Sequence, residues 1–267
     1  MLDLTLRRAP RALALATDGV QDWLSTGYAV SSVLTSIVVY DVVQRVAWRF
    51  GPDAQQDASR AMARSINRGA RRSGATIRVR GLENVDQTKN YIVVSNHQSL
   101  LDISLLTEHL GKLNPRYVSK VELARGVPGV SYNLRRGGSA LINRKDPAQS
   151  KAAIADLTRR VRDEGVTAVI FPEGTRSKTG AMKPFKTGGL KELVRGAPNT
   201  LILPVTSYGG SELFSRNMKP LVRGVELGMV FHKPMAAPPA SLGDEAFTAF
   251  TDELQRVIAS GLPQARN

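Results

Sequence analysis

The sequence of 267 residues contains no cysteine. Disulfide bonds, thiolate zinc sites and a cysteine nucleophile are therefore excluded, and the chain suits a reducing compartment. Histidine is scarce as well. His109 and His232 have no partner at metal-ligand spacing, so the sequence predicts no metal site.

Aromatic residues make up only 6% of the chain. No basic run is interleaved with aromatic side chains, as in proteins that stack single-stranded nucleic acid, and zinc-finger spacing is absent. The sequence also lacks a Walker loop and a Gly-x-Ser-x-Gly nucleophile elbow. These absences argue against nucleic acid as a partner and leave no evident covalent nucleophile.

Positive charge, in contrast, is abundant. The formal net charge is +14, while hydrophobic residues make up 42% of the chain, which is typical of a protein with a folded core. We expect anionic partners, either a surface of anionic lipids or phosphorylated substrates.

Residues 1–75 contain arginine but no lysine and differ in character from the rest. Residues 23–40 form a charge-free run of 18 residues, close to the shortest length that crosses a bilayer, but six of them are serine or threonine. Its apolar residues follow helical spacing with hydroxyls on the opposite side: Val30, Val33, Leu34, Ile37 and Val38.

We interpret residues 1–75 as two membrane-associating helices that lie on or dip into an anionic membrane. A helical hairpin packed on the body of the protein and a transmembrane span are the alternatives. The N-terminus lacks the hydrophobic region and cleavage site of a signal peptide, so we expect it to be retained. The predicted location is the cytoplasmic face of the inner or plasma membrane.

Residues 76–267 alternate between strand-like and helix-like patterns, which predicts a single α/β domain. We expect a mixed, mostly parallel sheet covered by helices. The predicted strands are Thr76–Arg80, Tyr91–Ser95, Arg116–Ser119, Ser139–Asn143, Ala168–Phe171, Leu201–Thr206 and Glu226–Phe231.

His97 follows one of these strands, and Asp102 comes five residues later. Within one regular helix the two side chains would lie about 140° apart. They meet only if His97 lies in the turn and Asp102 in the first turn of the next helix. The carboxylate would then hold Nδ1 and leave Nε2 free to take a proton. Taken alone, the pair fits a structural role better, with His97 at the helix entry and Asp102 as a solvated charge.

A second candidate site follows the strand that ends at Phe171. Gly174 permits a backbone turn that points amides at an anion, Arg176 offers a planar fork for phosphate, and Thr175 lies between them. Glu173 is unexpected beside a phosphate, and we expect it to orient the arginine or accept a substrate hydroxyl. An ordinary solvated turn is the alternative.

Three further cations lie near strand ends or helix starts. Lys120 and Arg144 each close a predicted strand, and Lys186 precedes a predicted helix whose free amides suit an anion. Each signal is weak alone.

In this order the motifs resemble the glycerolipid acyltransferase family, which includes 1-acylglycerol-3-phosphate acyltransferases. The resemblance spans about residues 76–235. Leu141 is a mild departure, because relatives often have phenylalanine there. The matching motifs are His97 with Asp102, Gly138 through Leu141-Ile142 to Arg144, Phe171 through Ser177, and Leu203-Pro204-Val205.

The resemblance implies an O-acyltransferase in which His97 and Asp102 are catalytic and His97 acts as base on a glycerol hydroxyl. The hydroxyl would attack an acyl thioester, acyl-CoA or acyl-ACP, without an acyl-enzyme. Arg144 and Arg176 would bind the acceptor phosphate, and no cofactor is expected. The expected acceptor is lysophosphatidic acid, which gives phosphatidic acid.

Glycerol 3-phosphate, a lysophospholipid or a lyso-aminolipid remain alternative acceptors. A non-catalytic protein that binds anionic membranes is the alternative from another class. It would need the arginines but not the His97 and Asp102 pair.

Overall fold

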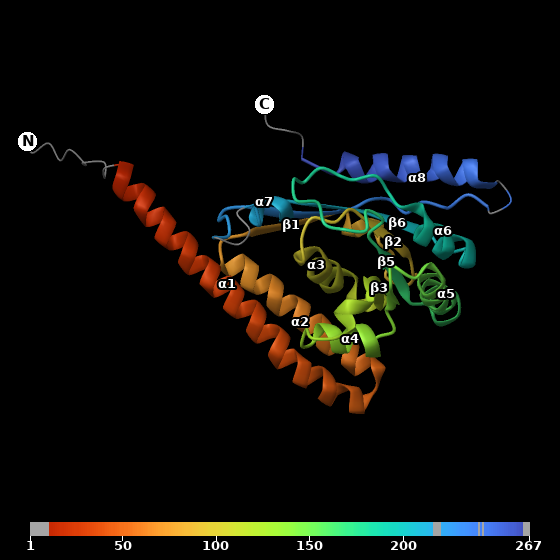
Figure 1. The fold of residues 1–267 in the computed structure, drawn as a ribbon, viewed down its shortest axis with the longest axis horizontal. Helices are drawn as coiled ribbons and strands as arrows, with labels where there is room; N and C mark the ends of the chain where they lie inside the picture. Colours follow the sequence, from red (N-terminus) through yellow and green to blue (C-terminus); the bar gives the residue numbers. More distant parts are fainter. Residues whose placement is uncertain (1–10, 216–219, 240, 242, 264–267) are drawn as a thin grey trace, which may run out of the picture.

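The structure, a computed structural model, describes residues 11–215, 220–239, 241 and 243–263. Within this part, seven strands form one sheet in the order β1-β7-β6-β2-β5-β3-β4 (Figure 1). Only β6 and β7 pair antiparallel among these strands. The sheet is thus mixed and mostly parallel, as predicted, and every predicted strand is present. The strands are β1 (Thr76–Arg80), β2 (Ile92–Ser95), β3 (Pro115–Lys120), β4 (Ala140–Ile142), β5 (Thr167–Ile170), β6 (Ile202–Tyr208) and β7 (Glu226–Phe231).

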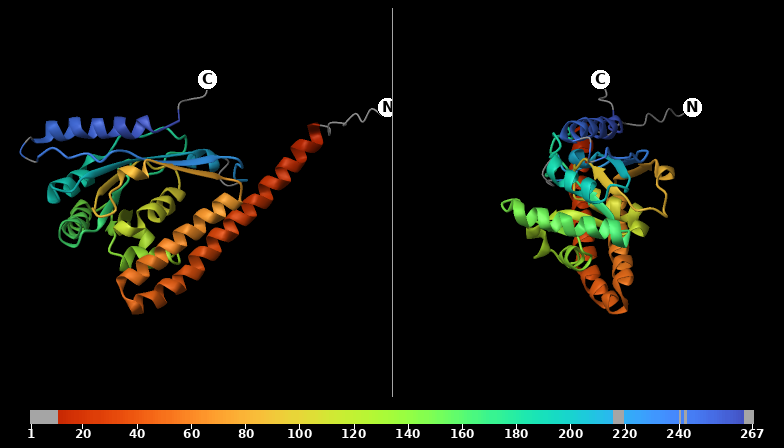
Figure 2. Two further views of the ribbon diagram at one scale, coloured as in Figure 1. Left: turned by 180° about the vertical axis from the view of Figure 1, so that it is seen from behind. Right: turned by 90° about the vertical axis from the view of Figure 1, so that its right-hand side faces the viewer.

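Helices cover both faces of the sheet (Figures 1 and 2). α3 (Leu101–Leu110) packs on one face, and α5 (Pro147–Glu164), α6 (Thr187–Gly196) and α8 (Gly243–Ser260) pack on the other. α4 (Val130–Arg136) and α7 (Gly210–Leu213) are short. This double cover explains why β2 is apolar from Ile92 to Val94, since side chains on both of its faces are buried.

Local signals set the ends of α5, as the sequence predicts. The Asp146 side chain accepts a hydrogen bond from the Gln149 amide at 3.0 Å, and Pro147 occupies the first turn. Gly165 ends the helix with a φ of 69°, a left-handed conformation that glycine adopts without strain.

The N-terminal region is a helical hairpin of α1 (Arg11–Ala47) and α2 (Pro52–Arg72), which lie side by side (Figure 2). Its buried positions on α1 are small or polar: Thr26, Ala29, Ser36 and Gln44. The hydroxyls of Ser36 and Ser65 meet at 2.8 Å between the helices. The predicted separation is not clean: of the predicted apolar stripe only Leu34 and Val38 are exposed, and Thr35 is exposed although Ser36 beside it is buried.

The hairpin also packs on the body of the protein, which was the alternative to a freely lying pair of helices. Ala29 and Ala70 share an apolar cluster with Leu101 and Leu213. The division of the chain at residue 75 stays a prediction.

A buried asparagine joins the hairpin to α3, the helix that carries Asp102. The Asn67 amide donates to Glu108 Oε2 at 2.6 Å, and its carbonyl oxygen accepts from the Ser104 hydroxyl at 2.6 Å. Asn67 is fully buried, so its two polar groups need these partners in place of water.

We expect Asn67→Ala to lower the free energy of unfolding by about 1–3 kcal/mol, because it removes two short hydrogen bonds between the hairpin and α3, one of them to a charged group. Urea unfolding followed by circular dichroism measures this. Arg68→Ala, at the exposed neighbouring position, is the matched control and should change stability by less than about 0.5 kcal/mol. Equal losses in the two variants would contradict the role of Asn67.

Candidate active site

The predicted site residues gather at the carboxyl edge of the parallel strands, where open α/β sheets place their ligands. β2 lies between β5 and β6 in the sheet. The turn after β2 carries His97, and the loop after β5 carries Glu173 and Arg176. Segments about 75 residues apart in the sequence are therefore neighbours in space.

His97 and Asp102 form the predicted pair. His97 Nδ1 lies 2.8 Å from Asp102 Oδ2, with His97 in the turn and Asp102 in the first turn of α3. The His97 ring stacks on Phe171 with centroids 4.1 Å apart. The His97 side chain is 13% exposed, and Nε2 has no hydrogen-bond partner in the part of the chain described here.

Asp102 is 2% exposed and accepts five hydrogen bonds. Oδ2 accepts from His97 and from the amides of Gln98 (2.7 Å) and Ser99 (2.9 Å). Oδ1 accepts from the hydroxyls of Ser99 (3.2 Å) and Ser207 (2.6 Å). The buried carboxylate is thus fully provided with donors.

The sequence prediction missed Ser207. The sequence marks Ser207 only as a hydroxyl in the apolar strand β6, two residues after the Leu203-Pro204-Val205 motif.

Glu173 contacts backbone groups, and both of its oxygens have partners. Oε1 accepts from the His97 amide at 2.8 Å, and Oε2 accepts from the Lys183 amide at 3.0 Å. The His97 carbonyl in turn accepts from the Ser177 amide at 2.7 Å. Burial raises the pKa of Glu173, which is 2% exposed. Glu173 therefore holds the loop that carries the histidine and does not bond Arg176, while its contact with a substrate hydroxyl stays a prediction.

Gly174 and Lys186 lie beside each other near the start of α6. Gly174 has a φ of 70°, and a Cβ built there would lie 3.7 Å from Lys186 Nζ. The Gly174 amide donates to Phe171 O at 3.0 Å, so it closes the turn. Thr175 and Arg176 follow at exposed positions.

Lys120 and Arg144 lie farther from His97. Lys120 is the last residue of β3, and Arg144 follows β4. These strands are two and three places from β2 in the sheet, or about 10 and 14 Å between strand axes. Both side chains are exposed, and within the described residues Lys120, Arg144, Arg176 and Lys186 have no carboxylate partner. The carboxyl edge thus presents cations that are not neutralised by the protein.

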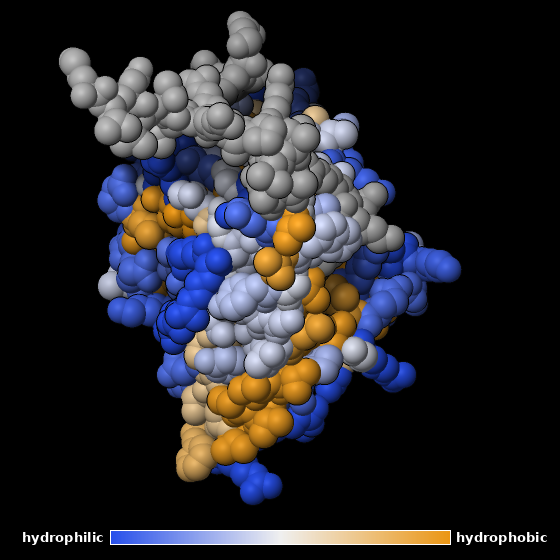
Figure 3. Space-filling view, turned by 90° about the vertical axis from the view of Figure 1, so that its left-hand side faces the viewer, coloured by the Kyte–Doolittle hydropathy of each residue, from blue (hydrophilic) through white to orange (hydrophobic). Residues whose placement is uncertain are grey.

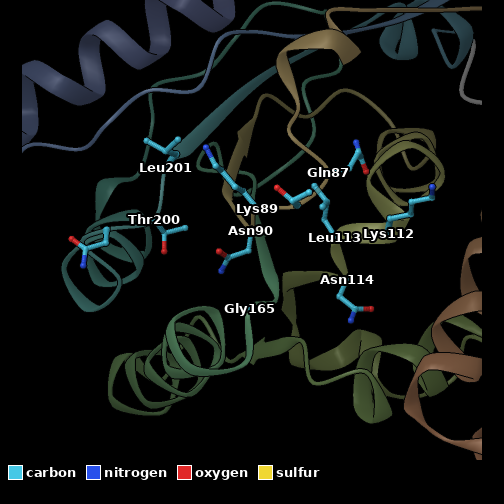
Figure 4. A pocket seen from close by; sticks show the side chains of 11 residues that line it. Gln87, Lys89, Asn90, Lys112, Leu113, Asn114, Gly165, Thr200 and Leu201 are labelled. Carbon is cyan, nitrogen blue, oxygen red and sulfur yellow. The ribbon is translucent and has the colours of Figure 1, made fainter.

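A cavity of about 510 Å³ lies elsewhere, at the amino ends of the strands (Figure 4). Lys89 and Asn90 before β2, Asn114 before β3 and Thr200 before β6 are among its lining residues. None of the predicted site residues contributes to it, so this cavity is separate from the His97 site.

The fold and the site together define an α/β protein with a histidine–aspartate pair at the carboxyl edge of its sheet. The family model for the acyltransferase domain matches residues 76–208, about half of the chain. The chain belongs to this acyltransferase family.

Curated relatives and a solved structure agree with this assignment. The chain is 29% identical to the chloroplastic 1-acyl-sn-glycerol-3-phosphate acyltransferase BAT2 of Brassica napus, over 67% of this chain and 51% of the relative. It is 29% identical to the human 1-acyl-sn-glycerol-3-phosphate acyltransferase beta, over 69% of this chain and 64% of the relative. The chain thus spans between half and two thirds of the length of these two relatives.

The crystal structure of the 1-acyl-sn-glycerophosphate acyltransferase PlsC from Thermotoga maritima has the same fold. It superposes with a TM-score of 0.73 and covers 91% of this chain and 95% of that one, at 24% identity.

The raised pKa of Glu173 predicts a pH dependence of stability. The unfolded chain loses this proton near pH 4.5, and the folded protein loses it at a higher pH. Between these two values the folded protein holds the extra proton, so its stability falls as pH rises. Glu173→Gln does not titrate there. We therefore expect the free energy of unfolding of the wild type, relative to Glu173→Gln, to decrease from about pH 4.5 upward. Urea unfolding at a series of pH values measures it, and parallel curves would contradict the prediction.

Proposed function

We propose that this chain transfers a fatty acyl group from an acyl-CoA or acyl-ACP thioester to the free hydroxyl of 1-acylglycerol 3-phosphate, giving phosphatidic acid. One observation carries the proposal: Asp102 holds His97 Nδ1 at 2.8 Å, while Nε2 has no partner within the described residues. The names of the relatives supply the acceptor.

In the proposed mechanism His97 is the general base. Nδ1–H donates to Asp102, so the lone pair on Nε2 takes the proton of the acceptor hydroxyl. The oxygen attacks the thioester carbonyl, and the tetrahedral intermediate collapses with loss of the thiolate. The imidazolium then returns its proton to the leaving sulfur. A positioned base contributes about 10²–10⁴-fold to the rate, and holding the two substrates together contributes much of the rest.

The unpaired cations support recognition of phosphate. Arg176 lies on the loop between β5 and α6, next to His97, and Lys186 ends this loop. The phosphate of 1-acylglycerol 3-phosphate is only a few bonds from its free hydroxyl. These two cations therefore suit the acceptor. Lys120 and Arg144 lie farther along the same edge, where they extend the positive surface toward the anionic donor and the phosphate.

The hairpin supports a location on an anionic membrane. Residues Gly19–Phe50 form one helix that is long and apolar enough to cross a bilayer, and only 17% of its apolar window is buried. Apolar side chains gather in the lower part of the view from the side of α1 (Figure 3). Along residues 19–50 the exposed apolar residues include Trp23, Leu24, Leu34, Val38, Val42, Val46 and Phe50.

We propose that α1 lies on the cytoplasmic face of the membrane and does not cross it. α1 is packed along α2, for example where Gln55 donates to Gln44 at 2.8 Å. A crossing α1 would carry the arginines of α2 into the hydrocarbon, at about 2.5–3.5 kcal/mol for each. The Thr26 hydroxyl, which accepts from the Leu221 amide at 2.8 Å, ties α1 to the segment after α7.

The activity is tested with labelled acyl-CoA or acyl-ACP, lysophosphatidic acid and purified protein. We expect phosphatidic acid from the wild type and a fall in kcat of about 10²–10⁴-fold in His97→Ala, because the base is removed. Circular dichroism verifies folding. His109→Gln, a histidine at the far end of α3, is the matched control and should retain its activity.

Full turnover in folded His97→Ala would refute the role of the histidine. Product only from glycerol 3-phosphate or another lysolipid would retain the mechanism and replace the acceptor. Absence of turnover with every donor and acceptor would refute the enzyme assignment.

Membrane binding is tested by sedimentation with vesicles that contain anionic lipid. We expect the double variant Val38→Asp/Val42→Asp to bind less, because it places charges in the apolar face of α1. Ala249→Asp/Ala259→Asp, which adds the same two charges at exposed positions of α8 on the other face of the sheet, is the control. Equal binding by all three proteins would contradict the proposed membrane face.

A further inference from the structure

Ser207 makes the shortest hydrogen bond to the Asp102 carboxylate. Its hydroxyl donates to Oδ1 at 2.6 Å, whereas the only other donor to Oδ1 among the described residues, the Ser99 hydroxyl, lies at 3.2 Å. Oδ2, in contrast, has three donors. The orientation of the carboxylate therefore depends on Ser207 more than on any other contact to Oδ1.

Ser207 is itself held by the residue that precedes the histidine. The Ser207 backbone amide donates to Asn96 Oδ1 at 2.7 Å, and the Asn96 side-chain nitrogen Nδ2 donates to the Ser207 carbonyl oxygen at 2.8 Å. β2 and β6 pair in parallel as far as Ser95 opposite Val205. The Asn96 side chain extends this pairing beyond the last strand residue, so the Ser207 backbone is fixed against the turn that carries His97.

The surroundings of Ser207 exclude a nucleophilic role. Its side chain is buried, with 1% of the residue exposed, and its proton is directed at Asp102. His97 Nδ1 lies on the other carboxylate oxygen, so the imidazole does not face the Ser207 hydroxyl. Its contacts permit an effect on the reaction only through Asp102.

We propose that Ser207 is a positioning residue for the His97 base: by fixing Asp102 Oδ1, it aligns Oδ2 with His97 Nδ1. Without the hydroxyl, the carboxylate keeps one long contact on Oδ1 and gains freedom to rotate about its Cβ–Cγ bond. His97 Nδ1 then loses its fixed acceptor, and the imidazole ring no longer holds Nε2 in one orientation. This inference rests on the proposed acyl transfer.

The first test is steady-state kinetics of Ser207→Ala. Loss of a hydrogen bond to a charged group predicts a fall in kcat of about 10- to 100-fold. The KM values for both substrates should not change, because Ser207 touches neither. The matched control is Thr206→Val. Thr206 is the buried neighbour in β6, and its hydroxyl bonds His232 and Ile258, so this variant removes similar contacts away from Asp102 and should keep kcat.

The second test does not depend on activity. The Nδ1 proton of His97, in the hydrogen bond to Asp102, is observed by proton NMR. We expect its resonance to move or broaden in Ser207→Ala and to remain unchanged in Thr206→Val. As a further check, Ser207→Ala should have little added effect on kcat in an Asp102→Asn background.

The outcomes separate the two hypotheses. Unchanged kcat in folded Ser207→Ala, or parallel losses of kcat and stability in Ser207→Ala and Thr206→Val, would overturn the positioning role. If the wild type transfers no acyl group but the His97 resonance still responds only to Ser207→Ala, the proposed function fails while the coupling from Ser207 to His97 holds. An unchanged resonance in Ser207→Ala overturns that coupling.

Discussion

The site depends on one constraint, which is the buried carboxylate of Asp102. A carboxylate that is 2% exposed needs donors from the protein, because water cannot supply them. Two of its donors are amides in the turn after β2, and one is the hydroxyl of Ser207 in β6. These bonds require the turn, the start of α3 and the end of β6 to meet at one point. The placement of His97 follows from them, since its ring bonds the same carboxylate.

A second buried carboxylate extends this arrangement to β5. Glu173 accepts from the His97 amide and from the Lys183 amide, so it fixes the histidine backbone and the following loop together. Phe171 stacks on the ring from the same segment. The segment from Phe171 to Ser177 therefore positions His97, and it also presents Arg176. This explains why a glutamate occurs in a loop that otherwise favours anions: its charge is used internally, against backbone donors.

Much of this was predictable from the sequence, for local reasons. Apolar runs located the seven strands, and the spacing of His97 and Asp102 required a turn between them, because a single helix would separate the two side chains. The partners of Glu173 and the role of Ser207 were not predictable. The bond between Ser207 and Asp102 joins residues 105 apart in the sequence, and it exists only because β6 lies beside β2. No pattern within either segment encodes that neighbour.

The orientation of α1 followed from its pattern only in part. The sequence separated hydroxyls from apolar residues, but a helix of a soluble protein would bury the apolar side. Here hydroxyls lie on both sides, since Thr26 and Ser36 are buried but Thr35 is exposed. The apolar side chains of Leu34 and Val38 are about half exposed. An apolar face of this extent is unfavourable in water and favourable against lipid. Because Thr26 bonds the segment after α7, next to β6, a membrane against this face would present its lipids beside the carboxyl edge that carries His97.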